Sequence, residues 1–458
     1  MFLRCSITLY QKTLFNRLNS FRLQYLPGTK TDFRQPLRNY LPIKGGETSF
    51  IWNFFRPTCF QSYSPVSLSQ CVVTWNSLKY SMSDLKSVLV VSPKPTHPAV
   101  AGNRQCILSY STMLRKNGFD VFLLWVADSA VSDIEYKETG LFWKDHLFIY
   151  KKNIFHRLSE AAIRHVYFQV TGYWPLDGAF PWGIERVVKQ IGLKHSFDFV
   201  IVNYVFLSRI FRYFKNCRKL LYTHDVFTNK FQRTGLKWFS LRPDAEQAAL
   251  NRADSVLSIQ KNESAFFRYL TKKKVCTSYN YFELCTTPYV DNKKILFLAG
   301  DNTHNIDSIL WYVKNVHREL IKVDPAFHLV IAGHICSKLP VLHDEENVSM
   351  LGTINDKKQF YTTGNIVINP TFEGTGLKIK SFEALAYGKV LISHSHGTEG
   401  VYQCDYDPFI IADNPNEYID TITSLNREKI IAYKQQSVNY VVSLNREVER
   451  IFNEALFH

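Results

Sequence analysis

The chain has 458 residues, of which 46% are hydrophobic and 21% charged, so it can bury the cores of two ordinary domains and is unlike a disordered polymer. Its net charge of +15 is uneven, because residues 1–81 hold ten Lys or Arg against two acids, Asp32 and Glu47. The remaining residues hold 45 bases and 38 acids. A balance this mild gives no sign of nucleic-acid binding.

Nine cysteines are scattered along the chain without a Cys-x-x-Cys pair. The odd number and the spacing argue against a secreted disulfide framework and against a zinc ribbon, so a cytoplasmic location is the simplest expectation. The longest apolar run, at 197–211, is interrupted by Asp198, Asn203 and Arg209, which excludes a membrane span. Peripheral contact with the inner face of a membrane stays open.

The first 81 residues have no period of 2 or 3.6. Three interpretations compete: an organellar transit peptide, a basic arm that touches anionic lipid, and a segment outside the native protein. The third has its own support, because Met82 lies five residues before the first strand-like run at 87–92.

From residue 87 onward, short apolar runs alternate with amphipathic stretches. In the first half, strands are predicted at 87–92, 119–126, 197–203, 219–223 and 255–259. Helices are predicted between them at 103–117, 184–191, 243–251 and 261–270. Gly118 follows the first of these and is a good helix stop.

The second half repeats the pattern. Strands are predicted at 294–299, 327–332, 365–369, 389–393 and 408–412, and helices at 305–321, 377–387, 417–425 and 427–457. Buried strands separated by helices form parallel sheets wound on both faces, so the fold class is α/β with two Rossmann-like domains facing a cleft. The expected domains are 82–285 and 286–428, joined by a linker near 281–292. A C-terminal helix at 429–458 is expected to pack back on the first domain.

The segment 369–388 is the richest in chemistry, because it joins a predicted strand to a predicted helix. Gly374 and Gly376 allow a tight turn that exposes backbone amides at the helix start, which is an anion site. Lys378 and Lys380 follow in the first helical turn, where cations oppose the helix dipole at a cost of about 0.3–1 kcal/mol each. A bound diphosphate would offset that cost.

Glu383 lies about two helical turns beyond Gly376, roughly 10 Å along the same face. At that distance its carboxylate could accept hydrogen bonds from the ribose of a nucleotide. The competing interpretation is that Lys380 and Glu383 form an ordinary surface pair and that the glycines merely make a turn.

With its Gly-x-Gly-Leu-Lys-x-Lys and Glu-Ala-Leu-Ala-x-Gly pattern, segment 369–388 resembles the donor-binding stretch of retaining GT-B glycosyltransferases of the group 1, or family 4, type. Within these it is most similar to the bacterial polysaccharide-biosynthesis members. The resemblance extends over further second-half motifs and over looser first-half ones, at 296–300, 305, 329–333, 389–393, 397–400, 92–104, 221–225 and 253–258.

The resemblance implies transfer of a sugar from a nucleotide diphosphate sugar to a glycan or lipid-linked acceptor, with retention and without a metal or other cofactor. It implies a donor site made of Gly300, Gly374, Thr375, Gly376, Lys378, Lys380 and Glu383. It also implies catalytic roles for His224, Asp225 and Lys378, and an acceptor or phosphate loop at Gly102, Asn103 and Arg104. The alternatives are that His224 and Asp225 cap a strand and a helix, and that Arg104 is simply solvated.

Two departures from the family pattern keep other functions open. Thr375 stands where many members carry a glutamate, and the loop 300–305 has no Lys or Arg. A same-fold sugar-nucleotide epimerase is one alternative. A non-catalytic sugar-nucleotide-binding protein is the other, and the missing acid at Thr375 is its best support. His394 and His396 have no further ligands at metal-binding spacing, so no metal site is expected. Three aromatic residues in a Gly/Pro-rich loop could contact sugar or lipid or simply pack: Tyr173, Trp174 and Trp182.

Overall fold

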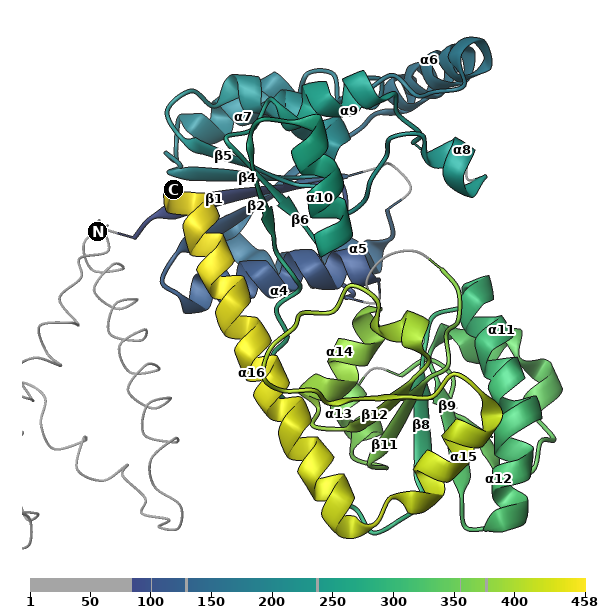
Figure 1. The fold of residues 1–458 in the computed structure, drawn as a ribbon. Coiled ribbons are helices and arrows are strands. Elements are labelled where there is room, and N and C mark those ends of the chain that lie inside the picture. Colours follow the sequence, from purple (N-terminus) through teal and green to yellow (C-terminus); the bar gives the residue numbers. More distant parts are fainter. Residues whose placement is uncertain (1–84, 100, 128–130, 236–238, 355, 375–377) are drawn as a thin grey trace, which may run out of the picture. The chain divides into compact units, whose positions relative to one another are not determined.

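The computed structural model describes residues 85–99, 101–127, 131–235, 239–354, 356–374 and 378–458 (Figure 1). The predictions for residues 1–81, Thr375 and Gly376 lie outside these ranges. The chain divides into a unit of residues 1–80 and a unit of residues 81–458, and every element below belongs to the second.

The first domain is built on a seven-stranded parallel sheet with the order β3-β2-β1-β4-β5-β6-β7. Its strands are β1 (Ser87–Ser92), β2 (Asp120–Ala127), β3 (Leu147–Lys151), β4 (Phe199–Asn203), β5 (Arg218–Tyr222), β6 (Ser255–Ser258) and β7 (Lys274–Thr277). Its helices are α4 (Gly102–Lys116), α5 (Asp133–Trp143), α6 (Ile154–Thr171), α7 (Ile184–Gly192), α8 (Lys230–Thr234), α9 (Pro243–Leu250) and α10 (Lys261–Leu270).

The second domain is built on a six-stranded parallel sheet with the order β10-β9-β8-β11-β12-β13. Its strands are β8 (Lys294–Leu298), β9 (His328–Ala332), β10 (Val348–Met350), β11 (Ile366–Asn369), β12 (Val390–Ser393) and β13 (Phe409–Ile411). Its helices are α11 (Thr303–Tyr312), α12 (Arg318–Val323), α13 (Lys357–Tyr361), α14 (Ile379–Ala386) and α15 (Pro415–Ser424), and α16 (Arg427–Phe457) follows them.

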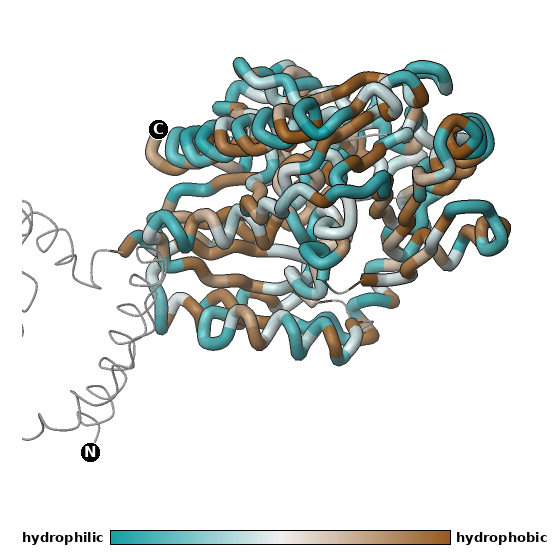
Figure 2. The backbone as a smooth tube through the Cα atoms, turned by 90° about the horizontal axis from the view of Figure 1, so that it is seen from below, coloured by the Kyte–Doolittle hydropathy of each residue, from teal (hydrophilic) through white to brown (hydrophobic). Residues whose placement is uncertain are grey.

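Both sheets are buried on both faces. The central strands β1, β4 and β11 are apolar and inaccessible over almost their whole length, as parallel strands covered by helices must be. Figure 2 shows hydrophobic segments running through the interior, while the helices alternate between hydrophobic and hydrophilic turns. The α/β class and the pair of Rossmann-like domains are thus confirmed.

Three strands and several helices were not predicted. Strands β3 and β10 lie at sheet edges and are only partly buried, so their patterns are short and mixed. Strand β7 is four residues long and begins with a lysine. The helix predicted at 305–321 is wrong as one regular helix, because a π-helical segment at Val313–His317 lies between α11 and α12.

Helix α16 packs on both domains (Figure 1). Near its middle, the Ser437 hydroxyl donates to the Lys389 carbonyl of the second domain at 2.7 Å. Near its end, Arg218 of β5 donates to the Ala455 carbonyl at 2.9 Å, and Lys274 of β7 pairs with Glu454 at 2.8 Å. The last two turns therefore lie against the first sheet.

None of the helices in the described ranges combines the length and apolar character that crossing a membrane requires. The six cysteines in these ranges are free thiols.

Candidate functional site

The start of α14 is held in place by the end of β11. The Asn369 side-chain amide donates to the Ser381 hydroxyl in the first turn of α14 at 2.8 Å. Gly397 must lack a side chain here, because a Cβ would lie 2.2 Å from Ser393 Oγ and 2.8 Å from Asn369 Nδ2. The glycine of the 397–400 motif thus lets a turn close over the carboxyl ends of β11 and β12.

Lys380 points back toward these strand ends rather than out to solvent. Its Nζ donates to Asn305 Oδ1 and to Thr371 Oγ1, both at 2.6 Å, and lies 5.1 Å from the centre of the Phe297 ring. Burial and, to a smaller extent, the nearby Lys378 charge together lower the pKa of Lys380 to about 7. Both hydrogen-bond acceptors are uncharged, so neither contact compensates the charge of the Lys380 ammonium group. A bound anion could compensate it.

Lys378 is the N-cap residue of α14, and its Nζ donates to the Gly374 carbonyl at 3.1 Å. Burial lowers the pKa of Lys378. Gly374 has a φ of +108°, a conformation that favours glycine, and a Cβ there would lie 3.1 Å from the His304 ring. The His396 ring nitrogen Nε2 lies 2.8 Å from the same Gly374 carbonyl. His304, His396 and Lys378 therefore surround this turn.

Glu383 contacts three other side chains. It accepts from Lys357 Nζ at 2.5 Å and from Tyr361 OH at 3.2 Å, both on α13. It also accepts from Gln105 Nε2 of α4 at 3.2 Å. The alternative of a simple surface pair between Lys380 and Glu383 is wrong, because each bonds to other groups and 14% of the Glu383 side chain is exposed.

Helices α4 and α14 of the two domains meet at their N-terminal turns. A Cβ on Gly102 would lie 2.8 Å from Ile379 Cδ1, so the glycine lets the helices approach closely. One turn further along, Gln105 reaches Glu383. The structure thus brings the predicted Gly102 loop of the first domain beside the predicted donor segment of the second.

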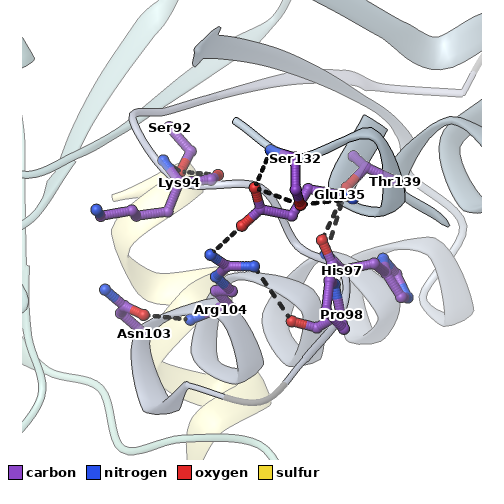
Figure 3. Close-up of polar contacts among 9 residues, drawn as sticks. All are labelled: Ser92, Lys94, His97, Pro98, Asn103, Arg104, Ser132, Glu135 and Thr139. Atoms are coloured by element: carbon purple, nitrogen blue, oxygen red, sulfur yellow. Dashed lines mark hydrogen bonds and ion pairs between the residues drawn. The ribbon is translucent and has the colours of Figure 1, made fainter. Parts of the chain in front are cut away.

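The loop that follows β1 and the start of α4 form a cross-linked polar cluster (Figure 3). Arg104 pairs with Glu135 and donates to the Pro98 carbonyl at 3.5 Å. Glu135 belongs to the capping box of α5, together with Ser132. Only 18% of the Arg104 side chain is exposed, so the alternative of a solvated arginine is wrong. One of its guanidinium nitrogens is already paired with the Glu135 carboxylate.

Asn103 connects this cluster to the next strand end, because its Nδ2 donates to the Tyr204 hydroxyl at 2.8 Å. Tyr204 follows β4 with a φ of +71°, and His224 follows β5 with a φ of +63°. A positive φ is uncommon for residues other than glycine, and residues with such a φ are concentrated at functional sites. The two rings stack with their centres 4.6 Å apart.

The hydrogen bonds of Asn203 fix the protonation of His224. Asn203 Nδ2 donates to the Val91 carbonyl at 3.0 Å, which leaves its Oδ1 as the acceptor 2.8 Å from His224 Nε2. His224 Nε2 therefore carries the proton. Burial lowers the pKa of His224 to about 3, so the ring is neutral and its Nδ1 keeps a lone pair.

The other predicted residues have local roles. Asp225 pairs with Lys230 and accepts from the backbone N–H of Val226 at 2.8 Å. The alternative that it caps a helix is wrong, since Asn229 is the N-cap residue of α8. Gly300 follows β8, and its carbonyl accepts from Asn305 Nδ2 at 3.0 Å.

Sequence reasoning missed several residues of this region, namely Asn203, Gln105, Lys357, Tyr361, His304 and the contact of His396 with Gly374. Asn203 had a signal, because it is a polar residue at the end of a buried strand, where ligands bind in such sheets. Lys357 and Gln105 had none, since their partner Glu383 is 26 and 278 residues away.

Residues 292–428, which contain the donor segment and its supporting strands, match the family described as Glycosyl transferases group 1. The match covers the second domain, which is a glycosyltransferase domain of this group. The two-domain architecture is the GT-B fold. The residues that match the glycosyltransferase model include Gly374, Lys378 and Lys380.

This glycosyltransferase is 24% identical over 364 residues to an uncharacterized 44.6 kDa protein in the cps region of Klebsiella pneumoniae, covering 72% of this chain and 88% of that protein. Among solved structures it is similar to Anabaena HepE in complex with UDP, with a TM-score of 0.53, 13% identity, and 81% of this chain and 100% of that chain covered. It is also similar to the pneumococcal O-GlcNAc transferase GtfA in complex with UDP and GlcNAc, with a TM-score of 0.54, 11% identity, and 82% and 100% covered.

Proposed function

We propose that this glycosyltransferase moves a sugar from a UDP-sugar to a glycan or lipid-linked acceptor, with retention of configuration and without a metal. The observation that carries the donor assignment is the pair of lysines at the start of α14. Lys378 Nζ contacts the Gly374 carbonyl, Lys380 Nζ contacts Asn305, and burial lowers the pKa of each lysine. A diphosphate would supply negative charge beside the buried Lys380 ammonium group, whose hydrogen bonds go to the uncharged Asn305 and Thr371 side chains.

The comparisons support the choice of nucleotide and the broad class of acceptor. HepE and GtfA were solved with UDP bound, which favours a uridine donor over other bases. The relative in the cps region favours a role in polysaccharide biosynthesis. Retention rests on the resemblance to retaining members of the family.

In the proposed mechanism the second domain holds the donor. As the glycosidic bond breaks, the leaving diphosphate gains charge, and Lys378 and Lys380 stabilise it in place of a metal. Glu383 accepts hydrogen bonds from the ribose after exchanging one of its present partners. Neutral His224, with a lone pair on Nδ1, accepts a hydrogen bond from a sugar hydroxyl at the first-domain side.

The donor is tested by thermal shift of the full chain with UDP, UDP-glucose, UDP-N-acetylglucosamine and GDP-mannose, since a bound ligand raises the apparent stability. We expect UDP and at least one UDP-sugar to raise the unfolding midpoint. Lys378→Met and Glu383→Ala should each weaken UDP binding about 10- to 100-fold, because hydrogen bonds to charged groups are lost. Calorimetric titration measures the dissociation constants.

Two matched controls lie on α12, where Lys322 and Glu319 are exposed and pair with each other. Lys322→Met and Glu319→Ala should leave the dissociation constant for UDP unchanged. If Lys378→Met and Glu383→Ala also leave it unchanged, the donor does not bind at α14. An epimerised UDP-sugar formed without acceptor would show the epimerase instead, and a transfer rate that EDTA abolishes would show that a metal is required.

A further inference from the structure

Helix α6 carries a continuous group of exposed apolar side chains. Phe155 is 77% exposed, Val166 62% and Val170 80%. Together with their neighbours they form what we call the α6 apolar face: Ile154, Phe155, Leu158, Ile163, Val166, Tyr167 and Val170. The helix extends away from the body of the first domain (Figure 1). Apolar patches of this kind on a soluble protein mark interaction sites.

The orientation of α6 is the reverse of that of an ordinary surface helix. Its polar residues His156 and Glu160 are buried, and Glu160 pairs with Lys152 at 3.0 Å and with Arg164 at 3.6 Å. The Arg164 guanidinium in turn lies 4.8 Å from the centre of the Trp174 ring. A surface helix normally turns its apolar stripe inward. Here ion pairs hold Glu160 on the inward side, and the apolar side chains face water.

The helix is well defined at both ends and is continued by further apolar groups. The Asn153 side chain accepts from the His156 N–H at 2.8 Å, and Gly172 ends the helix with a φ of +71°. Trp182, which is 61% exposed, contacts the His156 ring with ring centres 5.1 Å apart. The apolar face is therefore a fixed part of the fold, with an exposed tryptophan beside it.

The charges on α6 decide what covers this face. Its one acid, Glu160, is buried, whereas Arg157 and His165 are exposed. We propose that the α6 apolar face docks the protein on an anionic lipid surface, with the apolar side chains among the acyl chains and Arg157 at the headgroups. The exposed charge on α6 is positive, so a second copy of the same face would bring no complementary charge. Residues 1–81 carry ten bases against two acids, so their charge does not complement that of Arg157 either.

The test is co-sedimentation of the full chain with vesicles of phosphatidylcholine alone or of phosphatidylcholine mixed with anionic phosphatidylglycerol. We expect binding to the anionic vesicles that weakens at high salt. The triple variant Phe155→Ser, Leu158→Ser and Val166→Ser should lose roughly tenfold or more of that binding, because buried apolar area sets the affinity.

The control is a triple variant at exposed apolar positions elsewhere, Leu193→Ser, Tyr269→Ser and Val341→Ser, which are 87%, 87% and 69% exposed. It should bind vesicles like the parent protein. Both triple variants retain residues 1–81, so a basic arm cannot account for a difference between them. Both should keep the parental unfolding midpoint and the parental shift with UDP, which separates this test from the donor assignment.

Three results would overturn the proposal. Equal vesicle binding by the α6 variant and the parent would place lipid contact elsewhere. No binding of the parent to either vesicle would exclude a lipid surface. A dimer in analytical ultracentrifugation that the α6 variant alone abolishes, without vesicle binding, would identify a second copy as the occupant.

Discussion

Lys380 shows how one buried side chain links pH to ligand binding. In the free protein its ammonium group is surrounded by uncharged oxygens and a phenyl ring, and burial lowers its pKa to about 7. At pH 8.5 it is therefore mostly neutral, while the diphosphate of UDP is fully ionised. An anion bound beside it favours the charged form and raises its pKa.

We therefore expect UDP binding at pH 8.5 to take up close to one proton. Affinity should be greatest below about pH 7 and should fall by up to about tenfold per pH unit as the pH rises above it, until the pKa of the complex is reached. Calorimetric titration in two buffers with different heats of ionisation measures the proton uptake.

Two variants make this test specific. Lys380→Arg keeps a permanent charge, so it should bind UDP without proton uptake. Lys389→Met removes another lysine whose pKa burial lowers to about 7, but whose Nζ bonds to the Gly364 carbonyl, and it should leave the uptake unchanged. Uptake that persists in Lys380→Arg would contradict the assignment.

Among the elements, the contact between α4 and α14 joins the acceptor side to the donor side. It depends on Gly102, whose missing side chain makes room for Ile379, and on the hydrogen bond from Gln105 to Glu383 one turn away. Glycine at the first position of α4 is thus a packing requirement. It is not a turn requirement, because its φ lies in the ordinary helical region.

Gly102→Val should separate the two helix ends and destabilise the protein by about 1–3 kcal/mol, as overpacking does. The unfolding midpoint by calorimetry measures this. Gly140, inside α5, has open space where a Cβ would lie. Gly140→Val should therefore leave the midpoint unchanged or raise it slightly. Equal midpoints for both variants would show that the α4–α14 contact does not stabilise the protein.

At the scale of the molecule, α16 ties the two domains together. Phe452 is buried against the first sheet, with its ring centre 5.4 Å from that of Tyr110 and 6.2 Å from that of Tyr222. The earlier turns of the same helix are anchored to the second domain through Ser437 and through Lys434, which donates to the Thr287 carbonyl at 3.1 Å.

Phe452→Ala should lower the free energy of unfolding by about 3–5 kcal/mol, because it removes a large buried ring and leaves a cavity. Denaturant titration measures the loss. Ile431→Ala is the control in the same helix, since that side chain is 48% exposed, and it should cost less than about 1 kcal/mol. A loss for Phe452→Ala no larger than that of Ile431→Ala would mean that α16 does not secure the first domain.

The sequence by itself determined the alternation of strands and helices, the two parallel sheets and the loop of glycines and lysines before α14. These features depend on the period of apolar residues and on local backbone preferences, which neighbouring residues set. Edge strands such as β3 were not predicted, because half-exposed strands lack a clear hydrophobic pattern.

Only the tertiary structure decided which groups those residues meet. Lys380 bonds to Asn305, 75 residues earlier, and Glu383 bonds to Gln105, 278 residues earlier. The buried pair of Lys152 and Glu160 turns the apolar side of α6 outward, and the end of α16 reaches β5 and β7. Contacts between distant segments fix the charge state of a lysine and the exposed face of a helix, and no local pattern records them.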